Sequence, residues 1–542
     1  MKGSDHLKND GFSRRGFIES AGLSIAAASA HDGQSAPASA GADARVRHRP
    51  NLVLFMPDEL RADALSSFGN RICRTPNLDR LAAQGTRFSN CFVQYPVCGA
   101  SRCSLLTGWP TSVRGHRSLY YFLRPDEPNL FRYLKQNGYD VFWYGKNDAL
   151  ATQSFAGSVT EWNFTPQELI PRPARPRNPY SLGNPMYYSF LWNAASDRRD
   201  TADYQHLQAG IRILERRETP RPFCIFLPLS SPHPPYAAPK DFHDLYDPAK
   251  LPPLKPIGLP KRPNFHEGIR KAYRIQGLPE STFRKIRAVY LGMVSYTDWL
   301  LGELLEAIDR TRHTSDTAVF VLSDHGDYAG DYGLVEKWPS GLEDDLTHVP
   351  LIARVSGGAR GHVCNDLVEL FDVMASCLDL AGIQAEHTHF ARSLVPQIQG
   401  AAGDPERAAF SEGGYNVYEP QCFEPLLPRS AIYSPKTRLQ NEHPEMISRA
   451  AMVRTKTHKL ILRPSDQSEL YDYTRDPREL HNLYGESSVR SVQQELTRRL
   501  AIWYLNTSGI APFDKDPRAA PPFIPTPVFQ GEDWHRTILD ET

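Results

Sequence analysis

Short runs of apolar residues recur along the chain, separated by longer segments with helical spacing. The first run, 51–56, stops at Pro57-Asp58, which is the pattern of a buried central strand. Apolar residues at 130, 131 and 134 fall on one helical face, and Asn137-Gly138 ends that helix. The same reasoning predicts strands over 51–56, 141–144, 223–227, 318–322 and 350–354, and helices over 75–84, 130–136 and 283–309.

Strands that alternate with helices favour an α/β fold, in which a mostly parallel sheet is sandwiched by helices. In such sheets, binding sites form beyond the carboxyl ends of the strands. Polar residues follow several of the predicted strands directly: Asp58, Lys146, Pro232-His233 and Asp324-His325. We therefore expect one active site at that edge of the sheet.

The C-terminal part of the chain has a different pattern. Residues 454–462 and 469–472 are predicted to be short antiparallel strands, and a helix is predicted at about 488–505. We therefore expect a catalytic domain over 46–404. A smaller α+β C-terminal domain with a short antiparallel sheet is expected over 405–542.

The composition is that of an ordinary globular protein, with 40% hydrophobic and 23% charged residues. The chain has 62 basic and 62 acidic residues, so it lacks the basic excess of a nucleic-acid binder. No run after the N-terminal segment approaches the roughly 20 apolar residues that span a bilayer. The eight cysteines lack metal-ligand spacing and a dense disulfide pattern, so most should be small buried side chains or isolated thiols.

The N-terminal segment has the pattern of an export signal. Arg14-Arg15 precedes a weakly apolar run, 21–30, and small residues follow it. This order is typical of a twin-arginine signal, so we expect residues 1–45 to lie outside the fold and the protein to be periplasmic or extracellular. The alternative is a disordered tail that contains an arginine pair by chance.

The segment around Cys98 carries the most specific motif. Cys98-Gly99-Ala100-Ser101-Arg102, followed by Leu105-Leu106-Thr107-Gly108, resembles the signature of the sulfatase family. That resemblance extends from about residue 49 to about 505 and implies the alkaline-phosphatase-like fold. It also implies that a dedicated maturation enzyme oxidises Cys98 to formylglycine, whose hydrate attacks sulfur. Some maturation enzymes prefer Pro where this chain has Ala100. The alternative for Cys98 alone is a buried structural cysteine.

The resemblance also implies a site for one divalent cation, Ca²⁺ or alternatively Mg²⁺. Both ions prefer oxygen ligands and would lower the pKa of the attacking hydroxyl. The predicted ligands are Asp58, Glu59, Cys98, Asp324 and His325. Family members usually have a second aspartate where this chain has Glu59, so Asp58 is the better match.

Several cations and one imidazole complete the predicted site. By resemblance, Arg102 holds the nucleophile, Lys146 and Lys337 contact sulfate, and His233 donates a proton to the leaving alcohol. Histidine suits that role because its pKa lies near working pH. The family's Gly-Lys-x-His element has Asp148 in place of its histidine, which leaves the base for sulfate expulsion unassigned. Asp148 either substitutes for that histidine or recognises the substrate.

The sequence therefore predicts a sulfuric ester hydrolase acting on a sulfated small molecule or glycan. One alternative is a phosphonate monoester or phosphodiester hydrolase of the same superfamily. Another is a non-catalytic glycan-binding relative in which Cys98 stays unmodified. Aromatic residues crowd the segment 151–200, where they line a substrate cleft or else seal a loop onto the core.

Overall fold

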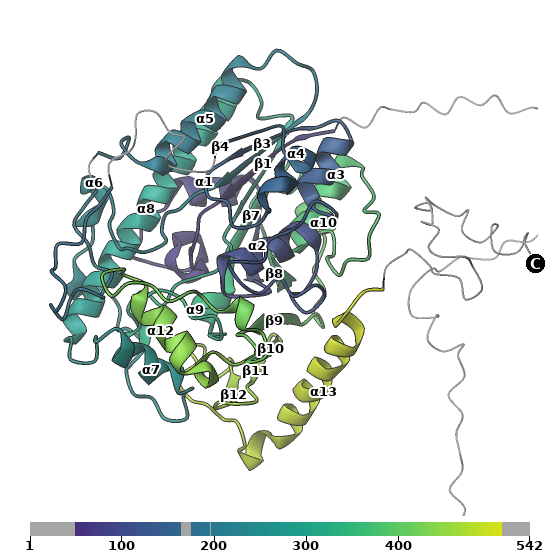
Figure 1. Cartoon of the computed structure of the whole chain (residues 1–542). Helices are drawn as coiled ribbons and strands as arrows, with labels where there is room; N and C mark the ends of the chain where they lie inside the picture. The colour runs from purple at the N-terminus through teal and green to yellow at the C-terminus, as the bar shows by residue number, and fades with distance from the viewer. Residues whose placement is uncertain (1–48, 164–174, 196, 512–542) are drawn as a thin grey trace, which may run out of the picture. The chain divides into compact units, whose positions relative to one another are not determined.

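A mostly parallel sheet forms the centre of the fold. The structure is a computed structural model that describes residues 49–163, 175–195 and 197–511, so the predicted export signal lies outside it. Within these residues, eight strands pair in the order β4-β3-β5-β1-β6-β7-β2-β8 (Figure 1). Only β7 runs antiparallel to its neighbours. The strands are β1 (Asn51–Met56), β2 (Thr86–Phe92), β3 (Asp140–Tyr144), β4 (Glu161–Asn163), β5 (Phe223–Pro228), β6 (Thr317–Leu322), β7 (His348–Arg354) and β8 (His362–Glu369).

Helices cover both faces of this sheet, as the alternating pattern predicted. In β1, Val53 and Phe55 point into one apolar core, while Leu52, Leu54 and Met56 point into the other. The first core includes residues of α1 (Pro76–Gln84), α5 (Ala202–Arg216) and α8 (Glu280–Arg310). The second includes residues of α2 (Cys98–Thr107), α3 (Leu130–Gln136) and α10 (Asp372–Ala381). Burial on both sides explains why β1 is apolar from Leu52 to Met56.

The sequence pattern missed β4 at one edge of the sheet, and β8 with its neighbour β2 at the other. Neither β2 nor β8 is a continuous apolar run, because some of their side chains are partly exposed.

Further helices before the C-terminal one are α4 (Phe155–Ser158), α6 (Lys240–His243), α7 (Phe265–Ala272), α9 (Asp344–Thr347), α11 (Val395–Ile398) and α12 (Ser434–Glu442).

A second sheet lies in the C-terminal part of the chain, as predicted. It is antiparallel, in the order β12-β11-β10-β9, and α13 (Arg490–Thr507) packs against it (Figure 1). Its strands are β9 (Ala409–Gly413), β10 (Ala450–Arg454), β11 (His458–Leu462) and β12 (Glu469–Asp472). The single strand predicted over 454–462 is wrong: Thr455 Oγ1 accepts from the His458 amide at 3.1 Å and closes a turn between β10 and β11.

Both sheets belong to one compact unit. The domain boundary at residue 405 therefore stays a prediction, although the small sheet begins nearby. All eight cysteines are buried free thiols, as expected for small core side chains. Among the described residues, none of the helices is both long enough and apolar enough for a bilayer span.

The contact of His387 with the last turn of α2 predicts acid sensitivity. Its Nε2–H donates to the Thr107 carbonyl at 2.7 Å, so Nδ1 accepts from the Tyr133 hydroxyl at 2.8 Å. Burial lowers the pKa of His387 from 6.5 to about 4. Between these two pH values the unfolded chain therefore binds more protons than the folded chain. The free energy of unfolding falls by roughly 2–3 kcal/mol as pH drops from about 6.5 towards 4.

We expect His387→Gln to lose less stability than the unmodified chain on acidification. Denaturant unfolding at about pH 7 and about pH 4.5 measures this difference. The exposed His481 gives a matched control, since His481→Gln should leave the pH dependence unchanged. Equal acid losses in His387→Gln and the unmodified chain would contradict the prediction.

Candidate active site

Cys98 is the first residue of α2 and is only 1% exposed. The loop after α2 packs against the neighbouring Gly99. A Cβ on Gly99 would lie 2.9 Å from a Phe122 ring carbon and 3.0 Å from the Ser118 carbonyl oxygen. Glycine at this position therefore lets the loop close over the start of the helix, beside Cys98.

Two adjacent parallel strands bring two aspartates to the same place. Strand β1 pairs with β6 in parallel, so Asp58 and Asp324 both follow carboxyl ends at one edge of the sheet. The hydroxyl of Ser323 holds the two loops together: it accepts from the Leu60 amide at 2.9 Å and donates to the Pro57 carbonyl at 3.0 Å. The sequence prediction that these segments meet is confirmed.

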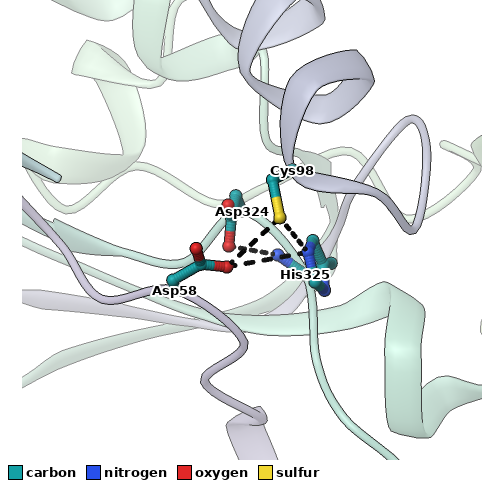
Figure 2. A group of neighbouring side chains, drawn as sticks. All are labelled: Asp58, Cys98, Asp324 and His325. Atoms are coloured by element: carbon teal, nitrogen blue, oxygen red, sulfur yellow. Dashed lines mark hydrogen bonds and ion pairs between the residues drawn. The ribbon is translucent and has the colours of Figure 1, made fainter. Parts of the chain in front are cut away.

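Four buried side chains converge at this edge, as Figure 2 shows. The Sγ atom of Cys98 lies 3.2 Å from His325 Nε2 and 3.5 Å from Asp58 Oδ1. His325 Nδ1 donates to the Gly326 carbonyl at 2.8 Å, which leaves Nε2 free as a ligand. One ligand atom from each of Asp58, Cys98, Asp324 and His325 lies within 4.8 Å of the others. This group has the geometry to hold a cation.

Arg102 and Lys146 surround the same aspartates. Arg102 Nε lies 2.8 Å from Asp324 Oδ2, and its Nη2 lies 3.1 Å from Asp58 Oδ2. Lys146 Nζ lies 2.5 Å from that same Asp58 oxygen. Burial alone would raise the pKa of Asp58, but Lys146 and Arg102 outweigh it and hold the pKa well below its ordinary value. Asp58 is therefore a carboxylate, and both predicted cations lie at the predicted site.

Glu59, His233 and Lys337 form a second group beside Cys98. Lys337 Nζ bonds to Glu59 Oε1 and lies 3.2 Å from His233 Nε2, which is also 3.2 Å from Glu59 Oε1. Glu59, Cys98 and His233 also place ligand atoms within 4.8 Å of one another. The Lys337 ammonium already contacts Glu59 and His233, so a positive charge is present in this group without a metal ion. The role of Glu59 as a metal ligand stays a prediction.

The Cys98 thiol is a poor nucleophile in this setting. Burial, reinforced by Asp58, raises the pKa of the Cys98 thiol well above 9.0, despite the nearby Lys146 and Lys337. Thiolate, and not thiol, is the reactive form of cysteine. The surroundings of Cys98 therefore do not activate it as a cysteine nucleophile.

A family model described as Sulfatase matches residues 50–383. The chain belongs to the sulfatase family. A second model, described as N-sulphoglucosamine sulphohydrolase, C-terminal, matches residues 330–504 of the sulfatase. The two matches together span nearly all of the described residues, including every predicted site residue.

The sulfatase has relatives among known proteins and solved structures. Human iduronate 2-sulfatase is 30% identical over 392 residues, which cover 65% of this chain and 69% of the relative. The phosphonate monoester hydrolase of Agrobacterium radiobacter is 21% identical with a TM-score of 0.67, over 85% of this chain and 96% of that one. A structure solved with its substrate D-glucosamine-2-N,6-O-disulfate is 19% identical with a TM-score of 0.66, over 85% and 98%. The predicted alkaline-phosphatase-like fold is confirmed.

Asp148 stands where the sulfatase pattern has histidine. Its Oδ2 lies 3.0 Å from Lys146 Nζ, which in turn lies 3.6 Å from Cys98 Sγ. Asp148 is thus separated from Cys98 by one lysine. Its carboxylate pairs with the Lys146 ammonium.

Sequence reasoning missed three residues next to the predicted ones. Glu336 Oε1 accepts from Lys337 Nζ at 2.9 Å. The Tyr433 ring centroid lies 6.5 Å from that of His233, and Lys436 pairs with Glu336. Glu336 could have been predicted, because it directly precedes the predicted site residue Lys337 in the sequence. Tyr433 and Lys436 gave no signal, because they lie about 100 residues further along the chain, outside any motif.

The aromatic segment 151–200 is partly tied to the rest of the sulfatase. The hydroxyls of Tyr187 and Tyr188 donate to the carbonyls of Ser430 and Arg429, at 2.7 and 2.6 Å. These two tyrosines therefore fasten a loop to the segment before α12. Trp162 remains 40% exposed, and Phe164 lies outside the described residues.

Proposed function

We propose that the sulfatase hydrolyses a sulfate monoester of a carbohydrate, using formylglycine made from Cys98 and one divalent cation. The observation that carries this proposal is the position of Cys98. Its Sγ lies within 3.6 Å of Asp58, Lys146 and His325, at the start of a helix and inside a ring of charged groups. An oxygen nucleophile attached at this position would lie against both cationic and anionic groups.

The donor set fits a divalent cation. Two carboxylates, an imidazole nitrogen and an oxygen of the modified residue 98 would hold it, with Ca²⁺ as the first candidate and Mg²⁺ as the alternative. When bound, the ion supplies Lewis-acid polarisation and lowers the pKa of a coordinated hydroxyl. On the two aspartates, Arg102 and Lys146 contact the Oδ2 atoms, so the Oδ1 atoms would face the ion. Asp324 Oδ1 also accepts from the Glu59 and His325 amides, which hold it in place.

The side chains support a balanced two-step reaction. A hydroxyl of the hydrated residue 98 loses its proton to water, and its oxygen forms a bond to sulfur as the bond from sulfur to the ester oxygen breaks. Lys146 and Lys337 stabilise the negative charge on the sulfate oxygens. The second hydroxyl then gives its proton to water, sulfate leaves with the first oxygen, and the aldehyde is restored for rehydration.

His233 is the proton donor for the leaving alcohol in this proposal. Burial, Lys337 and Lys146 lower its pKa well below 6.5, so His233 is neutral in the free protein near neutral pH. An anionic sulfate group beside the two lysines would offset their charge. Binding of the ester would therefore favour protonation of His233 when the proton is needed.

We expect His233→Gln to lose activity in proportion to how poor the leaving group is. For a sugar sulfate the loss should be roughly 10²- to 10⁴-fold, the usual contribution of general acid catalysis. It should be much smaller for an aryl sulfate, whose phenolate leaves without a proton. Steady-state kinetics with both esters measures this, and equal losses would rule out the proton-donor role.

Removal of divalent cations should abolish turnover. After dialysis against a chelator, we expect sulfate release to fall to background because a hydroxyl pKa is no longer lowered. Titration with Ca²⁺ or Mg²⁺ should restore it, and the ion that restores it at the lower concentration is the working one. The thermal midpoint should rise with added ion, since a ligand bound only by the folded chain stabilises it. Full activity after complete chelation would contradict this part of the proposal.

A carbohydrate substrate is supported by the relatives' names. One relative is an iduronate 2-sulfatase, and one solved structure holds D-glucosamine-2-N,6-O-disulfate. The likeness to a phosphonate monoester hydrolase supports the competing activity. Assays of sulfated glycans and their monosaccharides, aryl sulfate, and an aryl phosphodiester or phosphonate monoester in parallel test both. Higher kcat/KM for a phosphonate than for every sulfate would overturn the sulfatase assignment.

The proposal extends to maturation and location. Proteins with a twin-arginine signal cross the membrane folded, so a maturation enzyme would have to oxidise Cys98 in the cytoplasm. The mature protein would then be periplasmic or extracellular. Cell fractionation, combined with peptide mass spectrometry of residue 98, tests both statements. An unmodified thiol in protein from the native host would favour the glycan-binding alternative.

A further inference from the structure

Lys436 is a buried lysine that no catalytic motif includes. It lies on α12, the helix that comes between β9 and β10 in the sequence. Its side chain is only 3% exposed. Its Nζ lies 2.9 Å from Glu336 Oε1 and 3.5 Å from Glu424 Oε1. Gln440, on the same helix, donates to the same Glu424 oxygen at 3.0 Å. A buried ammonium persists only with such partners.

One carboxylate oxygen is shared between Lys436 and Lys337. Glu336 Oε1 accepts from both ammonium groups, each at 2.9 Å. Burial would raise the pKa of Glu336, but Lys337 and Lys436 outweigh it and lower the pKa, so Glu336 is ionised. The C-terminal part of the chain thus reaches the sulfate-binding lysine through a single carboxylate.

The charges show what Lys436 adds. Lys337 contacts the carboxyl groups of Glu59 and Glu336. Burial raises the pKa of Glu59 well above its ordinary value despite Lys337, whereas Glu336 is ionised. Without Lys436, the Glu336 charge would be offset by Lys337 alone. Lys436, which also pairs with Glu424, supplies a second positive charge at that carboxylate. In a buried site of low dielectric, that one charge strongly affects the affinity for a sulfate group.

The geometry points to Lys436 as a positioning residue for sulfate binding, an inference that rests on the proposed sulfatase function. It neutralises Glu336, so that the Lys337 ammonium stays available to the sulfate oxygens. Tyr433, at the start of the same helix, lies beside His233, and Lys436 Nζ is 5.9 Å from the Tyr433 ring centroid. Residues of α12 therefore contact the surroundings of both Lys337 and His233: Lys436 reaches Lys337 through Glu336, and Tyr433 lies near the His233 ring.

Calorimetric binding of inorganic sulfate to the full chain, together with kinetics on the best sulfate ester, tests the inference. We expect Lys436→Met to weaken sulfate binding and to raise KM by about 10- to 100-fold, the usual cost of losing a partner behind a ligand group. Lys436→Arg should restore most of the affinity. The double variant Lys436→Met with Glu336→Gln should also recover most of it, because the uncompensated carboxylate is gone.

A purely structural role for Lys436 gives a different result. The double variant would then be no better than Lys436→Met alone, and that outcome would overturn the inference. So would unchanged sulfate affinity in Lys436→Met. Lys250, whose side chain is 83% exposed, provides the matched control, since Lys250→Met should bind sulfate normally.

Three further results keep the test decisive. If Lys436→Met fails to fold, Glu336→Gln alone must bind sulfate at least as tightly as the unmodified chain, and weaker binding would refute the inference. If the unmodified chain binds sulfate but hydrolyses no sulfate ester, the proposed function fails while the binding comparison still decides the role of Lys436. If the unmodified chain does not bind sulfate, the inference is refuted.

Discussion

Replacing Cys98 with alanine is expected to reduce sulfate release by roughly 10⁴- to 10⁶-fold, on the scale seen when a covalent nucleophile is removed. The physical reason is that the remaining cations stabilise charge but carry no atom that can bond to sulfur. Binding of inorganic sulfate should survive, because Lys146 and Lys337 remain. Turnover and calorimetry on one preparation separate these two effects.

Cys103 offers a matched control on the same helix. It is equally buried, and its thiol donates to the Ala149 carbonyl at 3.5 Å, away from the charged group. Cys103→Ala should therefore keep wild-type turnover, apart from any small loss of stability. Full turnover in Cys98→Ala would refute the nucleophile assignment. Mass spectrometry of residue 98 adds an independent reading, since the aldehyde is lighter than the thiol.

Arg102→Met is expected to be the most destabilising single change at the site. Arg102 is fully buried and pairs with both Asp58 and Asp324, and the substitution leaves two buried carboxylates short of a partner. Breaking a buried pair from one side typically lowers the free energy of unfolding by about 3–5 kcal/mol. Activity should fall as well, because Asp324 would no longer be held towards Cys98.

Denaturant unfolding measures this loss, with Arg102→Lys as the conservative comparison. Lysine keeps the charge but lacks the planar fork that reaches two carboxylates. Arg102→Lys should therefore retain only part of the free energy of unfolding that Arg102→Met loses. Arg498 on α13 is an exposed control: it pairs with Glu495 at 2.9 Å, and Arg498→Met should change stability little. A loss no larger than that of the control would show that the two aspartates do not depend on Arg102.

The sequence predicted the central strands well because these strands are buried on both faces. Continuous apolar runs over β1, β5 and β6 follow directly from that environment. The edge strands β4 and β8, and β2 next to β8, mix polar with apolar residues, so their sequences resemble loops. The sequence predicts one strand where β10 and β11 form a hairpin, because the short turn contains polar residues that strands also accept.

The site was predictable where chemistry and strand ends coincide. Asp58 and Asp324-His325 follow adjacent parallel strands, and the motif around Cys98 supplied the proposed nucleophile. The sequence by itself thus determined the family, the fold class and the residues at the carboxyl edge of the sheet. Each of these depends on local pattern, or on a motif that is contiguous in the chain.

Only the tertiary structure decided how those residues divide into two groups. It placed Asp58, Cys98, Asp324 and His325 together as a candidate cation site, and it put Lys337 between Glu59 and His233. It also brought Lys436 to Glu336 from 100 residues away in the chain. Such contacts are set by packing in three dimensions, and the charge balance around a buried site has no signature in the order of residues.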